Sequence, residues 1–202
     1  ATFLPAAVLG AGLAKEAGRD SAAQRAVTEA WRHCPHPALG RLFLALNADR
    51  SAAERLKRVE TLVADNSGHA ESLMLLATQA LEAKQWGTAR RHLERAAAER
   101  PTAGVYRLLA RLEEAETGDG AAVRRRLQQA SEAPPDPAWL CTRCASASPA
   151  WSIVCDRCGA FDSVEWRSAP RAETGALPQE PTAAADDDEE QPAPAAAGTA
   201  AE

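Results

Sequence analysis

The stretch Ala70 to Pro101 reads AESLMLLATQALEAKQWGTARRHLERAAAERP, and its spacing of small and apolar residues decides the fold of most of the chain. These residues recur every three or four positions, which is the period of an amphipathic α-helix. They form two groups, which are Leu73, Leu76, Ala77 and Ala80, then Ala89, Leu93 and Ala96. Residues 84–88 separate the groups and predict a turn, with Trp86 packed beneath it. The stretch therefore predicts two closely packed helices, closed by Pro101.

The same spacing returns across the first 135 residues, which are rich in Ala, Leu, Arg and Glu and show almost none of the alternation typical of strands. A first pair starts at Leu4, and its matching positions are Ala7, Gly10, Ala11 and Ala14, then Ala23, Val27 and Ala30, with a closing Pro35. More divergent pairs are predicted at 38–48 with 52–64 and at 103–116 with 121–130. Helix pairs repeating about every 34 residues are typical of tetratricopeptide proteins. We predict an all-α, tetratricopeptide-like α-solenoid of about four helix pairs over residues 1–135.

Four of the five cysteines form two C-x-x-C pairs separated by ten residues, and they are Cys141, Cys144, Cys155 and Cys158. Each pair can form a tight turn whose two thiolates face one metal ion, and two such turns complete a tetrahedral all-sulfur site. This ligand set suits zinc, which we expect, or a single iron as the alternative. Because cysteine occupies all four positions and leaves none for water, we predict a structural ion. Two disulfides fit poorly, since neighbouring C-x-x-C thiols bridge mainly in redox enzymes with a βαβ context.

The cysteines belong to a short segment, residues 136–168, that we predict to be a zinc-ribbon or rubredoxin-like module. It holds four of the nine aromatic residues, namely Trp139, Trp151, Phe161 and Trp166. A domain of about 30 residues cannot bury enough surface to fold unaided, so the metal and the aromatic residues must stabilise it together. Gly159 follows Cys158, where such a turn favours a left-handed backbone, whereas Ala145 in the first turn is less suited.

A short linker with three prolines, ending at Pro137, leads into Trp139. So short a connection indicates that the cysteine module docks on the last helix pair, with Trp139 as the candidate for the contact. A freely tumbling module is the alternative.

Charge is distributed unevenly along the chain. The net charge is −5, yet residues 169–202 hold eight acidic residues and one arginine, so the remaining residues are slightly basic. This Pro- and Ala-rich segment has almost no large apolar side chains, and we predict a disordered acidic tail. No run approaches eighteen continuous apolar residues, so no membrane span is predicted and the chain as given is expected to be soluble. The missing initiator Met indicates the C-terminal part of a longer protein.

Other candidates for chemistry are weak. His33, Cys34 and His36 lie close together, but Pro35 and Pro37 interrupt them, and we expect a buried or inert Cys34, with a nucleophile or metal ligand as the alternative. The basic runs at 90–91 and 124–126 are typical of solvated helix faces, with a groove for acidic peptides as the alternative. No phosphate-binding glycine loop, HExxH or G-x-S-x-G motif is present. We therefore expect no enzymatic activity.

Nucleic-acid binding by the aromatic residues of the module is a further alternative. Residues 139–167 carry three arginines against three acidic residues, whereas a nucleic-acid ribbon usually shows a clear basic excess. We expect no nucleic-acid partner.

Two segments together resemble a known family. The first, Arg55 to Glu94, reads RLKRVETLVADNSGHAESLMLLATQALEAKQWGTARRHLE, and the second, Trp139 to Arg167, reads WLCTRCASASPAWSIVCDRCGAFDSVEWR. They resemble the C-terminal part of alphaproteobacterial HemY-type tetratricopeptide proteins, which are associated with late haem biosynthesis. The resemblance implies a non-enzymatic scaffold for protein partners, possible partners being late haem-biosynthesis enzymes. It places the parent protein at the cytoplasmic face of the inner membrane, held by an N-terminal anchor that this chain lacks.

A second family, the LapB lipopolysaccharide assembly proteins, is similar in architecture, because its repeats end in a rubredoxin-like metal module. That similarity implies an adaptor that presents a client enzyme to a membrane protease. Iron-based electron transfer by a rubredoxin-type module is the third reading. Ala145 departs from the C-x-x-C-G of rubredoxin turns, which weakens the iron reading more than the zinc reading.

Overall fold

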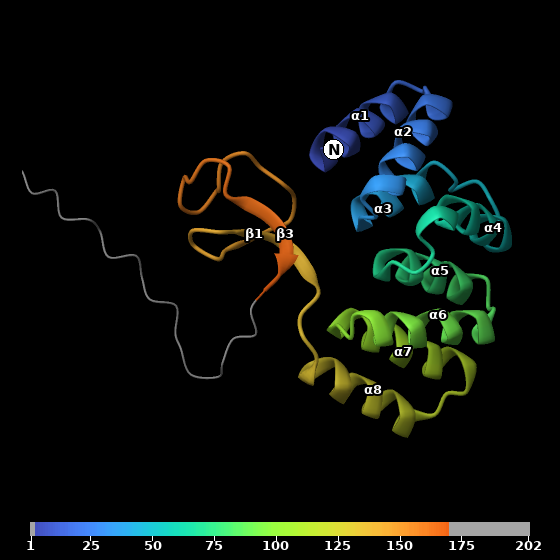
Figure 1. Ribbon diagram of the computed structural model, residues 1–202. Coiled ribbons are helices and arrows are strands. Elements are labelled where there is room, and N and C mark those ends of the chain that lie inside the picture. Colours follow the sequence, from blue (N-terminus) through green and yellow to red (C-terminus); the bar gives the residue numbers. More distant parts are fainter. Residues whose placement is uncertain (1–2, 170–202) are drawn as a thin grey trace, which may run out of the picture. The chain divides into compact units, whose positions relative to one another are not determined.

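The computed structural model describes residues 3–169, in which eight α-helices precede a three-stranded sheet (Figure 1). The helices are α1 (Leu4–Glu16), α2 (Asp20–His33), α3 (Pro37–Ala45), α4 (Ala52–Leu62), α5 (Ala70–Glu82), α6 (Trp86–Glu99), α7 (Ala103–Glu116) and α8 (Gly120–Glu132). Helices and strands belong to one compact unit. The mostly helical fold that the sequence predicts is confirmed. The predicted disordered tail lies outside the described residues, apart from Ala169.

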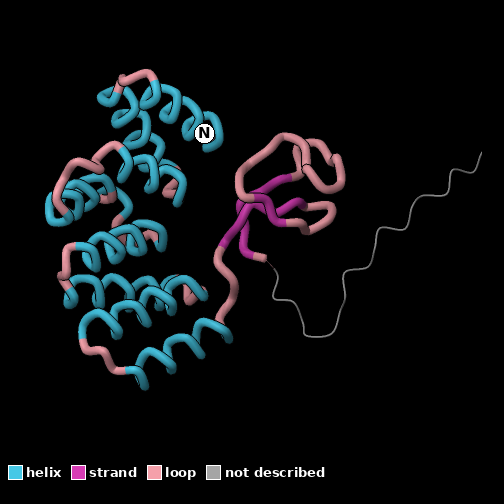
Figure 2. The backbone as a smooth tube through the Cα atoms, turned by 180° about the vertical axis from the view of Figure 1, so that it is seen from behind, coloured by secondary structure: helices cyan, strands magenta, loops and turns pink. Residues whose placement is uncertain are grey.

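Helices that follow one another in the chain pack side by side (Figure 2), except α3 and α4, which are not in close contact. The helices predicted at 38–48 and 52–64 therefore do not pack as the other three pairs do. In addition, α1 contacts α3, α3 contacts α5, and α5 contacts α7. The first helices of the four pairs therefore form one layer, which we call the odd-helix layer.

Burial follows the spacing of the Ala70–Pro101 stretch. All seven positions that the spacing marks are buried, and they are Leu73, Leu76, Ala77, Ala80, Ala89, Leu93 and Ala96. Alanine at the crossing of α5 and α6 lets the two backbones approach closely, and the leucines fill the space beside it. The first pair follows the same pattern at Ala11, Ala23 and Val27, whereas Gly10 is exposed.

The turn between α5 and α6 is shorter than predicted. It spans 83–85, because Lys84 adopts a left-handed backbone with φ of 55° and Trp86 already begins α6. Trp86 is partly buried and packs against the helical core. The side chain thus lies in the first helical turn and not beneath a loop.

The sheet has β1 (Pro137–Cys141) at its centre, with β2 (Ala147–Ser148) and β3 (Val164–Ser168) antiparallel on either side. In the register of β1 and β3, Trp139 lies opposite Trp166, and Cys141 lies opposite Val164. The pairing therefore brings the two tryptophans together in the sheet. It also places Cys141, the first residue of the cysteine site, at the end of β1.

The cysteine module and the linker before it contact the helical part at the start of α7, next to α3, and at Phe3 before α1. Residues before β1 meet the start of α7, where the Gly104 N–H donates to Asp136 Oδ1 at 2.9 Å and the Ala103 N–H donates to the Pro134 carbonyl at 2.9 Å. Trp139, however, lies against His36 next to α3. The prediction that Trp139 contacts the last helix pair is therefore wrong. The linker residues make that contact, and β1 carries Trp139 away from it.

Candidate metal centre

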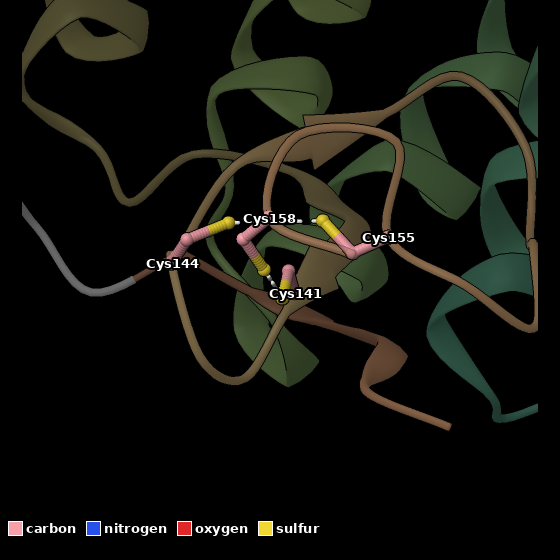
Figure 3. Close-up of side chains that lie close together, drawn as sticks. All are labelled: Cys141, Cys144, Cys155 and Cys158. Carbon is pink, nitrogen blue, oxygen red and sulfur yellow. Dashed lines mark hydrogen bonds between the residues drawn. The ribbon is translucent and has the colours of Figure 1, made fainter. Parts of the chain in front are cut away.

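The four cysteines come from two similar turns of the module. Cys141 ends β1 and Cys144 follows in the turn toward β2, while Cys155 and Cys158 lie in the loop between β2 and β3. Their four Sγ atoms lie within 4.8 Å of one another. Figure 3 shows the side chains pointing toward one point, and the Cys141–Cys158 and Cys144–Cys155 sulfur distances are both 3.7 Å.

These distances fit a tetrahedral metal site. A metal–sulfur bond of about 2.3 Å places the sulfurs of a regular tetrahedron about 3.8 Å apart. The two closest pairs match this separation, and they join the two turns to each other. The structure therefore brings all four predicted residues together in an arrangement that could hold one ion, and it leaves open which metal that is.

The backbone of the two turns repeats the same geometry. Ala145 N–H donates to the Cys141 carbonyl at 3.0 Å, and Gly159 N–H donates to the Cys155 carbonyl at 2.9 Å. Both donor residues have a left-handed backbone, with φ of 55° for Ala145 and 70° for Gly159. The expectation of a left-handed residue after the second pair is confirmed. Alanine adopts the same conformation after the first pair, where its Cβ makes it costly.

Hydroxyl groups surround the sulfurs. Cys141 Sγ donates to Ser163 Oγ at 3.4 Å, and Ser146 Oγ lies 3.1 Å from Cys144 Sγ and 3.5 Å from Cys155 Sγ. Hydrogen bonds to a thiolate stabilise its charged form and orient it toward a metal. Sequence reasoning missed both serines. Ser146 lies two residues beyond its cysteine and offered a weak local signal, whereas Ser163 reaches Cys141 only through the strand pairing.

The pKa values of Cys141, Cys155 and Cys158 are shifted in different directions. The hydroxyl of Ser163, followed by the backbone N–H of Cys144, lowers the pKa of Cys141 to about 6. The hydroxyl of Ser146 likewise lowers the pKa of Cys155. The Ala160 N–H lowers the pKa of Cys158, but burial and the neighbouring thiols outweigh it and raise that pKa to about 11. A bound dication would supply the positive charge that allows the four sulfurs to bind as thiolates.

An aromatic cluster joins this module to α3. The Trp139 and Trp166 ring centroids are 5.4 Å apart, and the His36 ring lies 5.5 Å from Trp139 and 4.3 Å from Trp166. His36 is only 2% exposed, and its Nδ1 accepts from the Ala38 N–H at the start of α3. Burial, assisted by the charge of Arg41, lowers the pKa of His36 to about 4. His36 is therefore a neutral histidine that caps the helix and supports the module.

The other candidate ligands do not converge. His33 Nε2 lies 3.1 Å from Glu29 Oε1, and Cys34 is half-buried, with its pKa raised by burial. Over residues 3–169, the cysteine cluster is the one place where three or more His, Cys, Asp or Glu side chains gather closely enough to hold an ion.

Two of the basic runs contribute to ion pairs between helices. Arg90 donates two hydrogen bonds to Glu113, at 3.0 and 3.1 Å, and a third to Glu116 at 2.5 Å. Arg126 approaches the same Glu113 at 3.6 Å. The hydrogen bond from Arg90 lowers the pKa of Glu113. Arg90 and Arg126 thus connect α6 and α8 to α7, whereas the other arginines of the two runs are exposed, as the prediction of solvated helix faces requires.

None of the helices within residues 3–169 has the length and apolar character needed to cross a bilayer.

Comparison with known proteins gives one informative similarity. No family model matches the chain. Over 186 residues the chain is 33% identical to a protein of Magnetospirillum gryphiswaldense described as probable magnetosome protein Mms48. The similarity covers 90% of this chain and 41% of that protein, so the chain spans well under half the length of the relative that it matches.

Proposed function

We propose that this chain is a tetratricopeptide-like α-solenoid of the HemY type, which binds protein partners and performs no catalysis itself. One observation carries the proposal. The odd-helix layer presents the half-buried apolar side chains of Leu44, Met74 and Leu75 around a cavity of about 310 Å³. Partly exposed apolar side chains on a rigid helical layer are typical of a surface that a partner covers. In this proposal the partners are enzymes of late haem biosynthesis.

We further propose that the cysteine module is a zinc ribbon with a structural role. Four protein thiolates leave no position for a substrate or for water, and the sulfur separations fit one ion. The alternative is a rubredoxin-type iron site that transfers electrons. Elemental analysis and an absorption spectrum of the purified chain separate the two. One zinc per chain without colour supports the structural role, and one redox-active iron would replace it.

The scaffold is tested by measuring capture of each purified late haem-biosynthesis enzyme by this chain. A Met74→Glu substitution places a charge in the odd-helix layer, and we expect it to weaken capture at least tenfold. Leu127→Glu is the matched control, because Leu127 is 49% exposed on α8, outside that layer. Equal loss with both variants, or capture that neither variant changes, would argue against the proposed surface.

Two other partner sets belong in the same capture experiment. A LapB-like adaptor would hold an enzyme of lipopolysaccharide synthesis together with a membrane protease, and its architecture also joins helical repeats to a metal module. A scaffold for magnetosome proteins is favoured by the 33% identity to the probable magnetosome protein. Selective capture of either set would replace the haem-related partners and leave the scaffold itself in place.

A further inference from the structure

A second cavity, of about 600 Å³, lies apart from the proposed metal site and mostly apart from the cavity of the odd-helix layer. Its walls come from residues 3–9, from the start of α3, and from the cysteine module. Eleven of its thirteen lining residues are apolar, and the largest are Phe3, Leu9, Trp139 and Trp151. Phe3 meets Trp151 edge to face, with ring centroids 5.2 Å apart. A volume and a lining of this kind are typical of small-molecule sites.

The apolar walls remain accessible to solvent. Phe3 is 58% exposed and Leu9 is 63% exposed. Large apolar side chains that surround a cavity and remain exposed to solvent indicate a site for a ligand or partner. Burial of these side chains by the ligand is favourable.

The polar side chains of this cavity are His36 and Arg41. Among the described residues, Arg41 makes no ion pair or side-chain hydrogen bond, although most other arginines near the helical core are paired. No carboxylate lines the cavity. The cavity therefore combines an apolar lining with one uncompensated positive charge.

His36 adds a hydrogen-bond donor without adding charge. Its Nδ1 accepts from the Ala38 N–H, so the proton of the neutral ring resides on Nε2. Nε2 has no hydrogen-bond partner among the described residues. The faces of the nearby aromatic rings are weak hydrogen-bond acceptors, and an oxygen atom of a ligand would be a better acceptor for the Nε2–H group of His36.

We propose that this cavity binds an apolar monocarboxylate, of the class of straight-chain fatty acids, with its carboxylate at Arg41 and its chain between Phe3, Leu9 and Trp151. An arginine guanidinium matches a carboxylate with two parallel hydrogen bonds. One cation compensates one negative charge, whereas a phosphate dianion would leave a second charge without a partner. This site goes beyond the proposed scaffold, because the ligand is a small molecule and its cavity shares only Arg41 with the cavity around Leu44, Met74 and Leu75.

The test is calorimetric titration of the full 202-residue chain with tetradecanoate below its micellar concentration. We expect one molecule bound per chain. We expect the uncharged analogue tetradecan-1-ol to bind at least tenfold more weakly, because it cannot pair with Arg41. Arg41→Glu should weaken tetradecanoate binding at least tenfold, and Arg58→Glu, at a second exposed arginine on α4, should leave it unchanged.

Position is tested by tryptophan fluorescence. A bromine-substituted tetradecanoate should quench the wild-type chain, and Trp151→Phe should remove a large part of the quenching while binding persists. Equal binding of acid and alcohol, no effect of Arg41→Glu in a variant with unchanged circular dichroism, or several molecules bound per chain would overturn the proposal. Displacement of tetradecanoate by an apolar peptide with a free carboxyl terminus, at lower concentration, would assign the cavity to a peptide and also overturn it.

Discussion

The helical part and the cysteine module are stabilised in opposite ways. The helical core is continuous from Leu4 to Leu112 and contains buried residues from seven helices. The buried core of the module consists of Cys141, Cys155 and Val164, with partly buried aromatic residues around it. Many apolar contacts share the stability of the first region, whereas the second depends on its sulfurs.

The two regions therefore differ in the substitutions that they tolerate. Loss of one methyl group from the helical core removes a small fraction of a large sum. The module has too few apolar contacts to compensate, so loss of one metal ligand should unfold it. The contacts of Trp139 and Asp136 with the helical part determine how much unfolding of the module destabilises the helices.

The largest expected effect is that of Cys155→Ser. Removing one thiolate should weaken metal binding severely, since metal binding in small ribbons supplies folding free energy on the order of 10 kcal/mol. We expect residues 137–168 to unfold, the near-ultraviolet dichroism of Trp139 and Trp166 to collapse, and most far-ultraviolet helix signal to remain. Removal of the ion with a chelator should reproduce this result.

Cys34→Ser is the matched control for that experiment, because Cys34 is a cysteine at the end of α2, away from the cluster. It should bind metal normally and keep both dichroism signals. A large loss of far-ultraviolet helix signal in Cys155→Ser would contradict the separate stabilisation of the two regions, since it would show that the helices need the module in order to fold.

A smaller effect is expected at the junction, for Gly104→Ala. A Cβ at Gly104 would lie 2.5 Å from Asp136 Oδ1, so the carboxylate must leave the Gly104 N–H that it accepts from. Loss of this hydrogen bond should destabilise the junction by about 1–3 kcal/mol. Limited proteolysis should then cleave near Asp136 faster. Gly87→Ala, on α6 with open space around its Cβ, should leave cleavage unchanged. Equal cleavage in both variants would mean that Asp136 does not hold the junction.

The main feature of each region could be predicted from sequence. The helices could be predicted because the spacing of Leu73, Ala77 and Leu93 is local and repeats the helical period. The cysteine cluster could be predicted because its chemistry lies in four residues at fixed spacing. Both predictions rest on patterns that a single short stretch contains.

The contacts between the regions could not be predicted in the same way. His36 meets Trp139 and Trp166 across more than one hundred residues of chain, and no local pattern marks such a pair. Sequence reasoning assigned no structural role to this histidine between two prolines, although it caps α3 and packs against two tryptophans of the sheet. Ser163 was missed for the same reason, because strand pairing and not spacing brings it to Cys141.

The smallest expected effect lies in the first cysteine turn, for Ala145→Gly. Ala145 has φ of 55°, a conformation that costs an alanine about 1–2 kcal/mol and that glycine adopts freely. Part of the gain is offset by the greater freedom of glycine in the unfolded chain, so we expect the module to gain about 0.5–1 kcal/mol. Because folding and metal binding are coupled, the gain should appear as a two- to fivefold tighter affinity, measured by competition with a chelator.

The reciprocal variant, Gly159→Ala, should weaken the affinity by a comparable factor, because Gly159 occupies the equivalent position of the second turn with φ of 70°. Opposite shifts in the two variants would mean that backbone conformation at these turns limits the stability of the module. A weaker affinity in Ala145→Gly would show instead that the Ala145 methyl group contributes more than the conformation costs. The module would then resemble the helical part, where packing decides.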